Sequence, residues 1–155
     1  MILRPAREED SRLIWTWRND CLTRAMFVTT DPVPWEDHRQ WYGRSLANPD
    51  RWILVGEDKD QPVGVLRLDR TCGRVAKISI NVRPESRGRG VGREILALGA
   101  AFAVRLGLVC LEANIKAENV ASIALFRGVG FDCAGSENGL EKYVLHLPVA
   151  PGITS

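Results

Sequence analysis

The chain is poor in the residues that build metal sites, disulfide frameworks and membrane spans. It has two histidines, His38 and His146, and four cysteines without a C-x-x-C pair, so we expect no metal site and reduced thiols. No apolar run approaches the roughly 20 residues of a membrane-spanning helix, and the N-terminal residues lack the apolar stretch of a secretory signal. These absences predict a cytoplasmic protein with no membrane partner.

Strong charge of either sign is also missing. The 21 Lys and Arg residues against 19 Asp and Glu residues leave a net charge of +2, which is too small to indicate a nucleic-acid partner. Hydrophobic content of 45% and charged content of 26% are globular averages, and 155 residues suit one domain. We expect a single domain over residues 1–147 and a flexible tail over residues 148–155.

Apolar periodicity and chain breakers predict an α/β fold. Apolar residues from Val91 to Leu106 recur at helical spacing, and Gly107 provides a stop. The expected elements, in chain order, are a strand at 2–4, helices at 12–20 and 35–46, strands at 52–56, 63–68 and 75–82, a helix at 91–106, a strand at 109–115, a helix at 120–126, and strands at 131–134 and 142–147. No internal repeat divides the chain.

Three glycines in five positions, Gly88, Gly90 and Gly92, lie between the strand expected at 75–82 and the helix expected from Val91. Glycines let backbone N–H groups approach a ligand closely, and the N-terminus of a helix attracts an anion. The segment 87–92 therefore predicts a cradle for a pyrophosphate. The simpler alternative is a tight turn with solvated arginines.

Other glycine-rich motifs do not fit this loop. A Walker A loop ends in Gly-Lys-Ser/Thr, whereas this loop continues as Gly92-Arg93-Glu94. A dinucleotide fingerprint requires G-x-G-x-x-G, and the final glycine is missing after both Gly88 and Gly90. An RNA-binding arginine-glycine segment is repetitive, whereas this one occurs once.

Two motifs resemble those of the GNAT superfamily of N-acetyltransferases. The first is R-x-x-G-x-G at residues 87–92, preceded by V-R-P-E at residues 82–85. The second runs from Asn119 to Phe126 and leaves through the glycine-phenylalanine pair at residues 130–131. The resemblance implies a mixed, mostly antiparallel central sheet flanked by about four helices, with acetyl-CoA as co-substrate and no metal.

The resemblance also implies which residues hold acetyl-CoA. The cofactor enters a gap where the fourth and fifth strands splay apart after a bulge, and its pantetheine pairs with residues 80–82 like an added strand. Residues 87–92 hold the pyrophosphate through N–H groups, with charge from Arg87 and Arg89, and Asn119 lies near the sulfur end. The implied cofactor-binding residues are Ile80, Asn81, Val82, Arg87, Gly88, Arg89, Gly90, Val91, Gly92, Asn119 and Phe126.

Phe126 occupies the position at which many family members have a tyrosine that protonates the leaving thiolate, and phenylalanine has no proton to give. A base must be sought on the strands, where Ser79 and Asn81 alternate with apolar residues, as do Glu112 and Asn114. If the two strands are neighbours, these side chains would face one cavity. Glu112 is the only acid in the set and is the candidate catalytic base. Its alternative role is that of a solvated or salt-bridged strand residue.

The first helices form the acceptor wall in this superfamily, and here they are rich in tryptophan. We expect Trp17, Arg18 and Asn19 to contact the substrate, although tryptophans of this kind are more often core residues. The segment resembles both nucleotide-aminosugar and ribosomal-protein N-terminal acetyltransferases. The predicted acceptor is therefore a small-molecule primary amine, that of a nucleotide-linked aminosugar, with a protein N-terminus as the alternative. A non-catalytic acetyl-CoA-binding module also stays open, as does the choice between a monomer and a homodimer.

Overall fold

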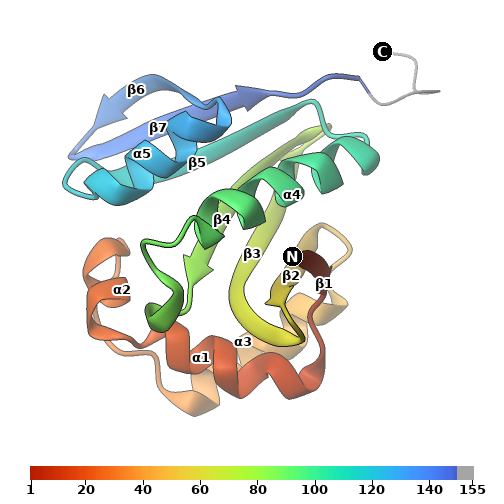
Figure 1. Cartoon of the computed structure of the whole chain (residues 1–155), viewed down its shortest axis with the longest axis vertical. Helices are drawn as coiled ribbons and strands as arrows, with labels where there is room; N and C mark the ends of the chain where they lie inside the picture. Colours follow the sequence, from red (N-terminus) through yellow and green to blue (C-terminus); the bar gives the residue numbers. More distant parts are fainter. Residues whose placement is uncertain (150–155) are drawn as a thin grey trace.

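The computed structural model describes residues 1–149 and shows a mixed α/β chain built on one seven-stranded sheet (Figure 1). The strand order is β1-β2-β3-β4-β5-β7-β6. Neighbouring strands are antiparallel except β4 and β5, which are parallel. The expected α/β class and mostly antiparallel sheet are confirmed.

The secondary structure follows the expected order, with some different boundaries. The strands are β1 (Ile2–Pro5), β2 (Arg51–Asp58), β3 (Gln61–Cys72), β4 (Val75–Val82), β5 (Cys110–Lys116), β6 (Asp132–Glu137) and β7 (Leu140–His146). The helices are α1 (Ser11–Arg18), α2 (Cys21–Met26), α3 (Trp35–Ala47), α4 (Val91–Arg105) and α5 (Val120–Val129), with short 3-10 turns at Glu8–Asp10 and Pro84–Ser86.

The main departure from expectation is α2, which the sequence pattern did not predict. The part of the chain that the structure describes therefore has five α-helices rather than about four. The α2 helix is six residues long, and its N-cap is Asp20, whose carboxylate accepts the backbone N–H of Thr23 at 3.1 Å. Of the expected tail, Pro148 and Val149 have no regular structure, and residues 150–155 lie outside the described residues.

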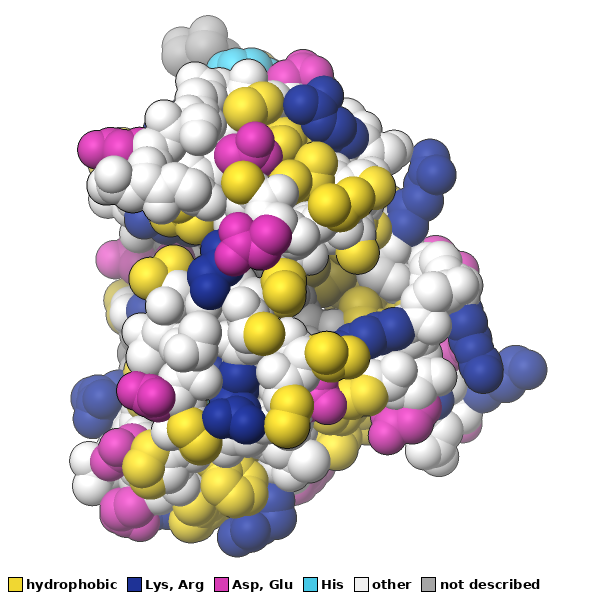
Figure 2. All heavy atoms as spheres, turned by 90° about the vertical axis from the view of Figure 1, so that its left-hand side faces the viewer, with side chains coloured by type: hydrophobic (Ala, Val, Ile, Leu, Met, Phe, Trp, Pro, Cys, Tyr) yellow, Lys and Arg dark blue, Asp and Glu magenta, His cyan; other side chains and the backbone are white. Residues whose placement is uncertain are grey.

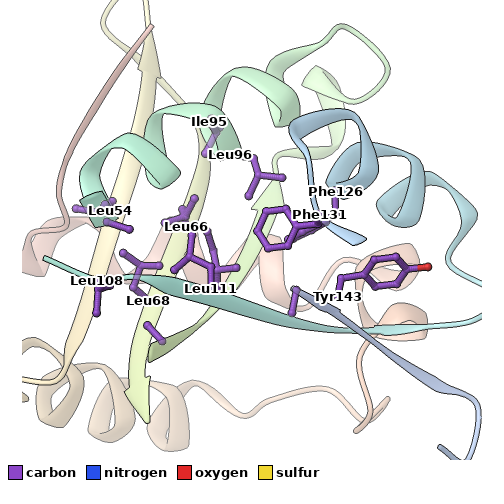
Figure 3. Close-up of a cluster of buried hydrophobic side chains, with 14 of the residues drawn as sticks. Leu54, Leu66, Leu68, Ile95, Leu96, Leu108, Leu111, Phe126, Phe131 and Tyr143 are labelled. Carbon is purple, nitrogen blue, oxygen red and sulfur yellow. The ribbon is translucent and has the colours of Figure 1, made fainter. Parts of the chain in front are cut away.

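The core is divided between the two faces of the sheet because strand residues alternate in direction. Leu66 and Leu68 of β3 are 0% exposed and pack with Ile95 and Leu96 of α4, and Figure 3 shows this cluster between α4 and the sheet. On the other face a smaller cluster joins α1 and α3 to β2; its buried members are Ile14, Tyr42, Ile53 and Val55. The sheet is therefore anchored by helices on both faces.

The parallel strands β4 and β5 pair over a short distance and then separate. Their pairing covers Val75 to Lys77 against Cys110 to Glu112, and Figure 1 shows the two strands diverging beyond it into a V. The pairing of β4 with β3 continues without a register shift from Ala76 to Val82. The splay implied by the family resemblance is thus present. The β3–β4 register shifts only between Arg70 and Cys72, at the opposite end of β4 from the splay.

Candidate active site

Residues 87–92, which we call the glycine loop, follow β4 through the Pro84–Ser86 turn, at the end where the V is open. Figure 2 views the molecule from the open side of the V and shows a hollow near its centre with hydrophobic side chains around it. Gly88 and Gly90 have φ angles of 76° and 77°, in the left-handed region that favours glycine, and Gly90 is the N-cap of α4. The first N–H groups of α4 have no partner within the helix. This end of the V therefore offers N–H donors to an anion.

Gly92 serves a different purpose from the other two glycines. A Cβ atom at this position would lie 3.2 Å from Leu125 Cδ2 and 3.3 Å from Val82 Cγ2. Glycine therefore lets the first turn of α4 pack closely against both β4 and α5. Backbone conformation explains two of the three glycines, and close packing explains the third.

Arg87 and Arg89, both expected to supply charge to a pyrophosphate, lie in different surroundings. Arg89 is exposed on the loop. Arg87 is half-buried, and its guanidinium donates to Asp20 Oδ2 at 3.1 Å and to the hydroxyl of Thr23. Its backbone N–H donates to Pro84 O at 3.4 Å. In this structure Arg87 thus ties the glycine loop to α2.

The α2 helix lies across the mouth of the V and contacts both of its arms. On the β4 side, Thr23 Oγ1 is 3.5 Å from Asn81 Oδ1. On the β5 side, Lys116 Nζ donates to the carbonyl oxygen of Ala25 at 3.0 Å. A helix that the sequence pattern missed therefore joins the two splayed strands to each other.

A cavity of about 360 Å³ lies beside β4 on the face covered by α1 and α3, and we call it the α1–α3 cavity. Ser79, Ile80 and Asn81 form its β4 wall, so it adjoins the strand edge expected to pair with pantetheine. The remaining lining residues are Ile14, Arg18, Phe27, Val33, Asp37, His38, Trp41, Ile53, Val65 and Arg67.

Only one of the three expected substrate residues lines this cavity. Arg18 does so, whereas Trp17 is 4% exposed and faces the protein interior. Asn19 is bound to the backbone of Val33, donating from Nδ2 to the carbonyl oxygen at 2.9 Å and accepting the N–H at 2.8 Å. Trp17 is therefore a core residue and Asn19 fastens the segment between α2 and α3, so the structure places neither at the acceptor.

His38, Asp37 and Arg67 also line the cavity, and the sequence reasoning assigned none of them to it. His38 is buried, and its Nε2 lies 3.0 Å from the carbonyl oxygen of Ser11, an arrangement in which Nε2 donates. Burial lowers the pKa of His38, although this hydrogen bond opposes the effect. Along β3, Val65 and Arg67 alternate with the buried Leu66 and Leu68. This alternation was the signal that could have placed Arg67 on the cavity face.

The polar residues of β4 and β5 share one face of the sheet, because Lys77 pairs with Glu112, but they do not line one cavity. Ser79 and Asn81 line the α1–α3 cavity, but Asn114 lines a second, more open cavity of about 780 Å³ beside β5, β7 and the β6–β7 turn. Glu112 lines neither cavity and lies 3.2 Å from Lys142 Nζ, with its side chain 23% exposed. The two sets of polar side chains thus lie on the two different arms of the V.

The second motif holds α5 in place. The side chain of Asn119 accepts the N–H of Ser122 at 3.2 Å and so caps the helix. Phe126 is 2% exposed and packs edge-to-face against Phe131, with ring centroids 5.0 Å apart (Figure 3). In this structure Asn119 therefore caps α5 and Phe126 packs in the core, both beside the V.

Residues 1–149 contain neither a metal-binding cluster nor a helix able to span a membrane. Within that range no group of three or more His, Cys, Asp or Glu residues is placed to hold a metal ion. None of the helices described combines the length and apolar character needed to cross a bilayer.

Comparison with known proteins identifies the family. A family model described as an acetyltransferase (GNAT) domain matches residues 1–132. The chain is 35% identical over 118 residues to the N-alpha-acetyltransferase RimI of Mycobacterium tuberculosis, a match covering 74% of this chain and 70% of RimI. It is 30% identical over 139 residues to YwnH of Bacillus subtilis, named as a candidate phosphinothricin acetyltransferase, covering 84% and 83% of the two chains. The chain belongs to the GNAT family.

The fold supports the same assignment. The structure of yncA from Salmonella typhimurium, a candidate acetyltransferase solved with its cofactor acetyl-CoA, superimposes with a TM-score of 0.79 at 23% identity, covering 100% of this chain and 98% of the other. The family match and the relatives named as acetyltransferases identify the domain as an acetyl-CoA-dependent N-acetyltransferase. The chain is also 25% identical over 145 residues to MJ1062 from Methanocaldococcus jannaschii. That match covers 84% of this chain but only 28% of the length of MJ1062.

Proposed function

We propose that acetyl-CoA binds in the V between β4 and β5 and that the acetyl group reaches the α1–α3 cavity. The observation that carries this proposal is the edge of β4, which has no β5 partner beyond Lys77 and leads directly into the glycine loop. Pantetheine would pair with Ile80–Val82 as an added strand. The pyrophosphate would accept N–H groups from residues 88–92, with Arg89 contributing charge.

We further propose that the acceptor is a small primary amine held in the α1–α3 cavity. Its volume of about 360 Å³ suits a small molecule, and its β4 wall is the strand edge assigned above to the cofactor. The aminosugar of a nucleotide-linked sugar would be such an amine. A protein N-terminus is the second candidate, favoured by the 35% identity to RimI, which is named an N-alpha-acetyltransferase.

The proposed chemistry is attack of the neutral amine on the thioester carbon, so that a C–N bond forms and the C–S bond breaks. A backbone N–H near Val82 would stabilise the oxyanion. Glu112, the only carboxylate on β4 or β5, lies outside the α1–α3 cavity, so it would take the proton of the amine through a chain of water molecules. Because Phe126 has no hydroxyl, the thiolate would receive its proton from the amine product or from water.

The experiment that tests this function is release of free coenzyme A thiol from acetyl-CoA over a panel of amines, with mass spectrometry of the acetylated product. The panel contains amino acids, aminosugars and their nucleotide-linked forms, N-terminal peptides and polyamines. Transfer to at least one amine is expected. Tight acetyl-CoA binding with no transfer to any amine would contradict the enzyme and support a binding module.

The four free cysteines agree with the cytoplasmic location that we also propose.

A further inference from the structure

Arg18 is a half-buried cation that lines the α1–α3 cavity and lacks a full set of acceptors. Its Nη1 is inaccessible to solvent and has no hydrogen-bond partner among the described residues. Its Nη2 has a long contact of 3.3 Å to the carbonyl oxygen of Thr29, and the guanidinium lies 3.8 Å from the centroid of the Phe27 ring. Nη1 is as closed to a ligand as it is to solvent. An arginine has five donors in a fixed fork, however, and Arg18 lines the α1–α3 cavity, so its other donors remain for a ligand there.

The charges around Arg18 make this part of the cavity positive. Arg24 and Arg67 act on it with like charge, which adds to burial in lowering its pKa. Arg67 itself is paired with Asp69 at 2.9 Å. Asp37 is the only carboxylate lining the cavity, and within residues 1–149 it forms no ion pair with Arg18. The protein thus leaves the charge of Arg18 uncompensated.

Partial burial of a charge without an anionic partner is unfavourable, and an oxyanion bound beside Arg18 would form charge-assisted hydrogen bonds with its guanidinium. If the cofactor lies along β4, the acceptor amine must approach the β4 wall formed by Ser79 to Asn81, whereas Arg18 belongs to the α1 wall. A ligand that satisfies both walls has an amine at one end and an anionic oxygen group at the other. A polyamine would instead place a second cation near Arg18.

We propose that the acceptor carries a carboxylate or phosphate group and that Arg18 binds it, so that the enzyme discriminates against polyamines. This inference rests on the proposed function, because it takes the α1–α3 cavity as the acceptor site. It adds the chemical class of the acceptor and the residue that selects it.

The test uses pairs of amines that differ only in the anion. An amino acid is compared with its decarboxylated amine, phosphoethanolamine with ethanolamine, and an aminosugar phosphate with the aminosugar; the first pair reports a carboxylate and the other two a phosphate. For the wild-type enzyme we expect kcat/KM at least about tenfold higher for the anionic member of one pair. Equal use of both members in every pair, or a polyamine as the best acceptor, would overturn the proposal.

The residue assignment is tested with Arg18→Met and a matched Arg12→Met control on the same helix. Arg12 is exposed, lies against the ring of Trp35 and does not line the cavity. Arg18→Met should lower kcat/KM for the anionic acceptor by about 10- to 100-fold and leave the uncharged partner within a fewfold. Arg12→Met should change neither. Equal losses for both members of a pair would contradict a role in binding the anion.

Calorimetric titration separates failure of this inference from failure of the proposed function. The anionic amine is titrated into the protein loaded with coenzyme A, which requires no turnover. Binding to wild type that is weakened at least tenfold in Arg18→Met, with unchanged coenzyme A affinity, supports the inference even if no transfer is detected. Undiminished binding to Arg18→Met refutes it. If Arg18→Met does not fold, Arg18→Lys replaces it in the titration, because lysine keeps the positive charge but lacks the guanidinium fork.

Discussion

Arg87 of the glycine loop donates to the carboxylate of Asp20 at 3.1 Å and so joins the loop to the N-terminus of α2. The same carboxylate caps α2 through the N–H of Thr23. A cofactor pyrophosphate placed on the loop would compete with Asp20 for Arg87. The loop and the helix across the mouth of the V are therefore coupled through one carboxylate.

This competition predicts opposite effects for two substitutions. Asp20→Asn keeps a good N-cap but removes the charge. It should therefore free Arg87 and tighten acetyl-CoA binding by up to about fivefold, which corresponds to the free energy of a half-exposed ion pair. Arg87→Met should weaken binding by a similar factor. The dissociation constants are measured by calorimetry. Shifts in the same direction for both variants, or no shift in either, would show that Arg87 serves only to hold α2.

The role of Glu112 can be separated from that of its ion pair with Lys142. Glu112→Gln removes the carboxylate, and Lys142→Met removes the same ion pair but leaves the carboxylate in place. If Glu112 is the base, the first variant should lose about 100-fold or more in kcat, and the second should stay within a fewfold of wild type. Acetyl-CoA affinity should be unchanged in both. Equal activities for the two variants would assign Glu112 to structure alone.

Much of the fold could be predicted from local patterns. The strand at Val75–Val82 has the predicted boundaries, and the glycine loop opens α4 as the spacing indicated. The α2 helix could not be found this way, because six residues are too short for a helix to be stable by propensity. It depends on the Asp20 cap and on tertiary contacts from Arg87 and Lys116.

In the candidate site, the glycine loop could be predicted because a sequence motif defines its backbone. The extent of the V depends on where β4 loses its β5 partner, and no local pattern sets this point. Sequence also placed Trp17 and Arg18 together at the acceptor, since both are on α1. The helix directs Trp17 into the protein and Arg18 into the cavity, a difference that depends on packing against the sheet.

Two glycines in helices should respond oppositely to replacement by alanine. A Cβ at Gly99 of α4 would lie 2.4 Å from Leu66 Cδ1, a side chain that is itself 0% exposed. We expect Gly99→Ala to lower the free energy of unfolding by about 1–3 kcal/mol, because the strain of overpacking outweighs the better helix propensity of alanine.

Gly43 of α3 provides the matched control. It is exposed, and a Cβ there would meet nothing within 4 Å, so Gly43→Ala should raise the free energy of unfolding by about 0.5–1 kcal/mol. Urea denaturation of both variants checks the pair. A stabilising Gly99→Ala would mean that α4 packs less closely on β3 than the structure shows.

The buried His38 predicts a pH dependence of stability. Burial lowers its pKa below the ordinary value of 6.5, so between the lowered pKa and 6.5 the unfolded chain binds more protons than the folded one. The free energy of unfolding should therefore fall as pH drops through this window. His38→Gln should show a smaller decrease than wild type, whereas His146→Gln, at an exposed position, should follow wild type. Urea denaturation at a series of pH values measures this, and parallel curves for all three proteins would contradict the account.

Amide hydrogen exchange with and without acetyl-CoA tests the central claim most directly. If the cofactor lies in the V, pantetheine pairing and the pyrophosphate should slow exchange in peptides covering residues 80–92, while peptides covering β1 and β2 should be unchanged. Protection that falls elsewhere and leaves residues 80–92 unaffected, with the protein shown to be saturated, would contradict the placement of acetyl-CoA between β4 and β5.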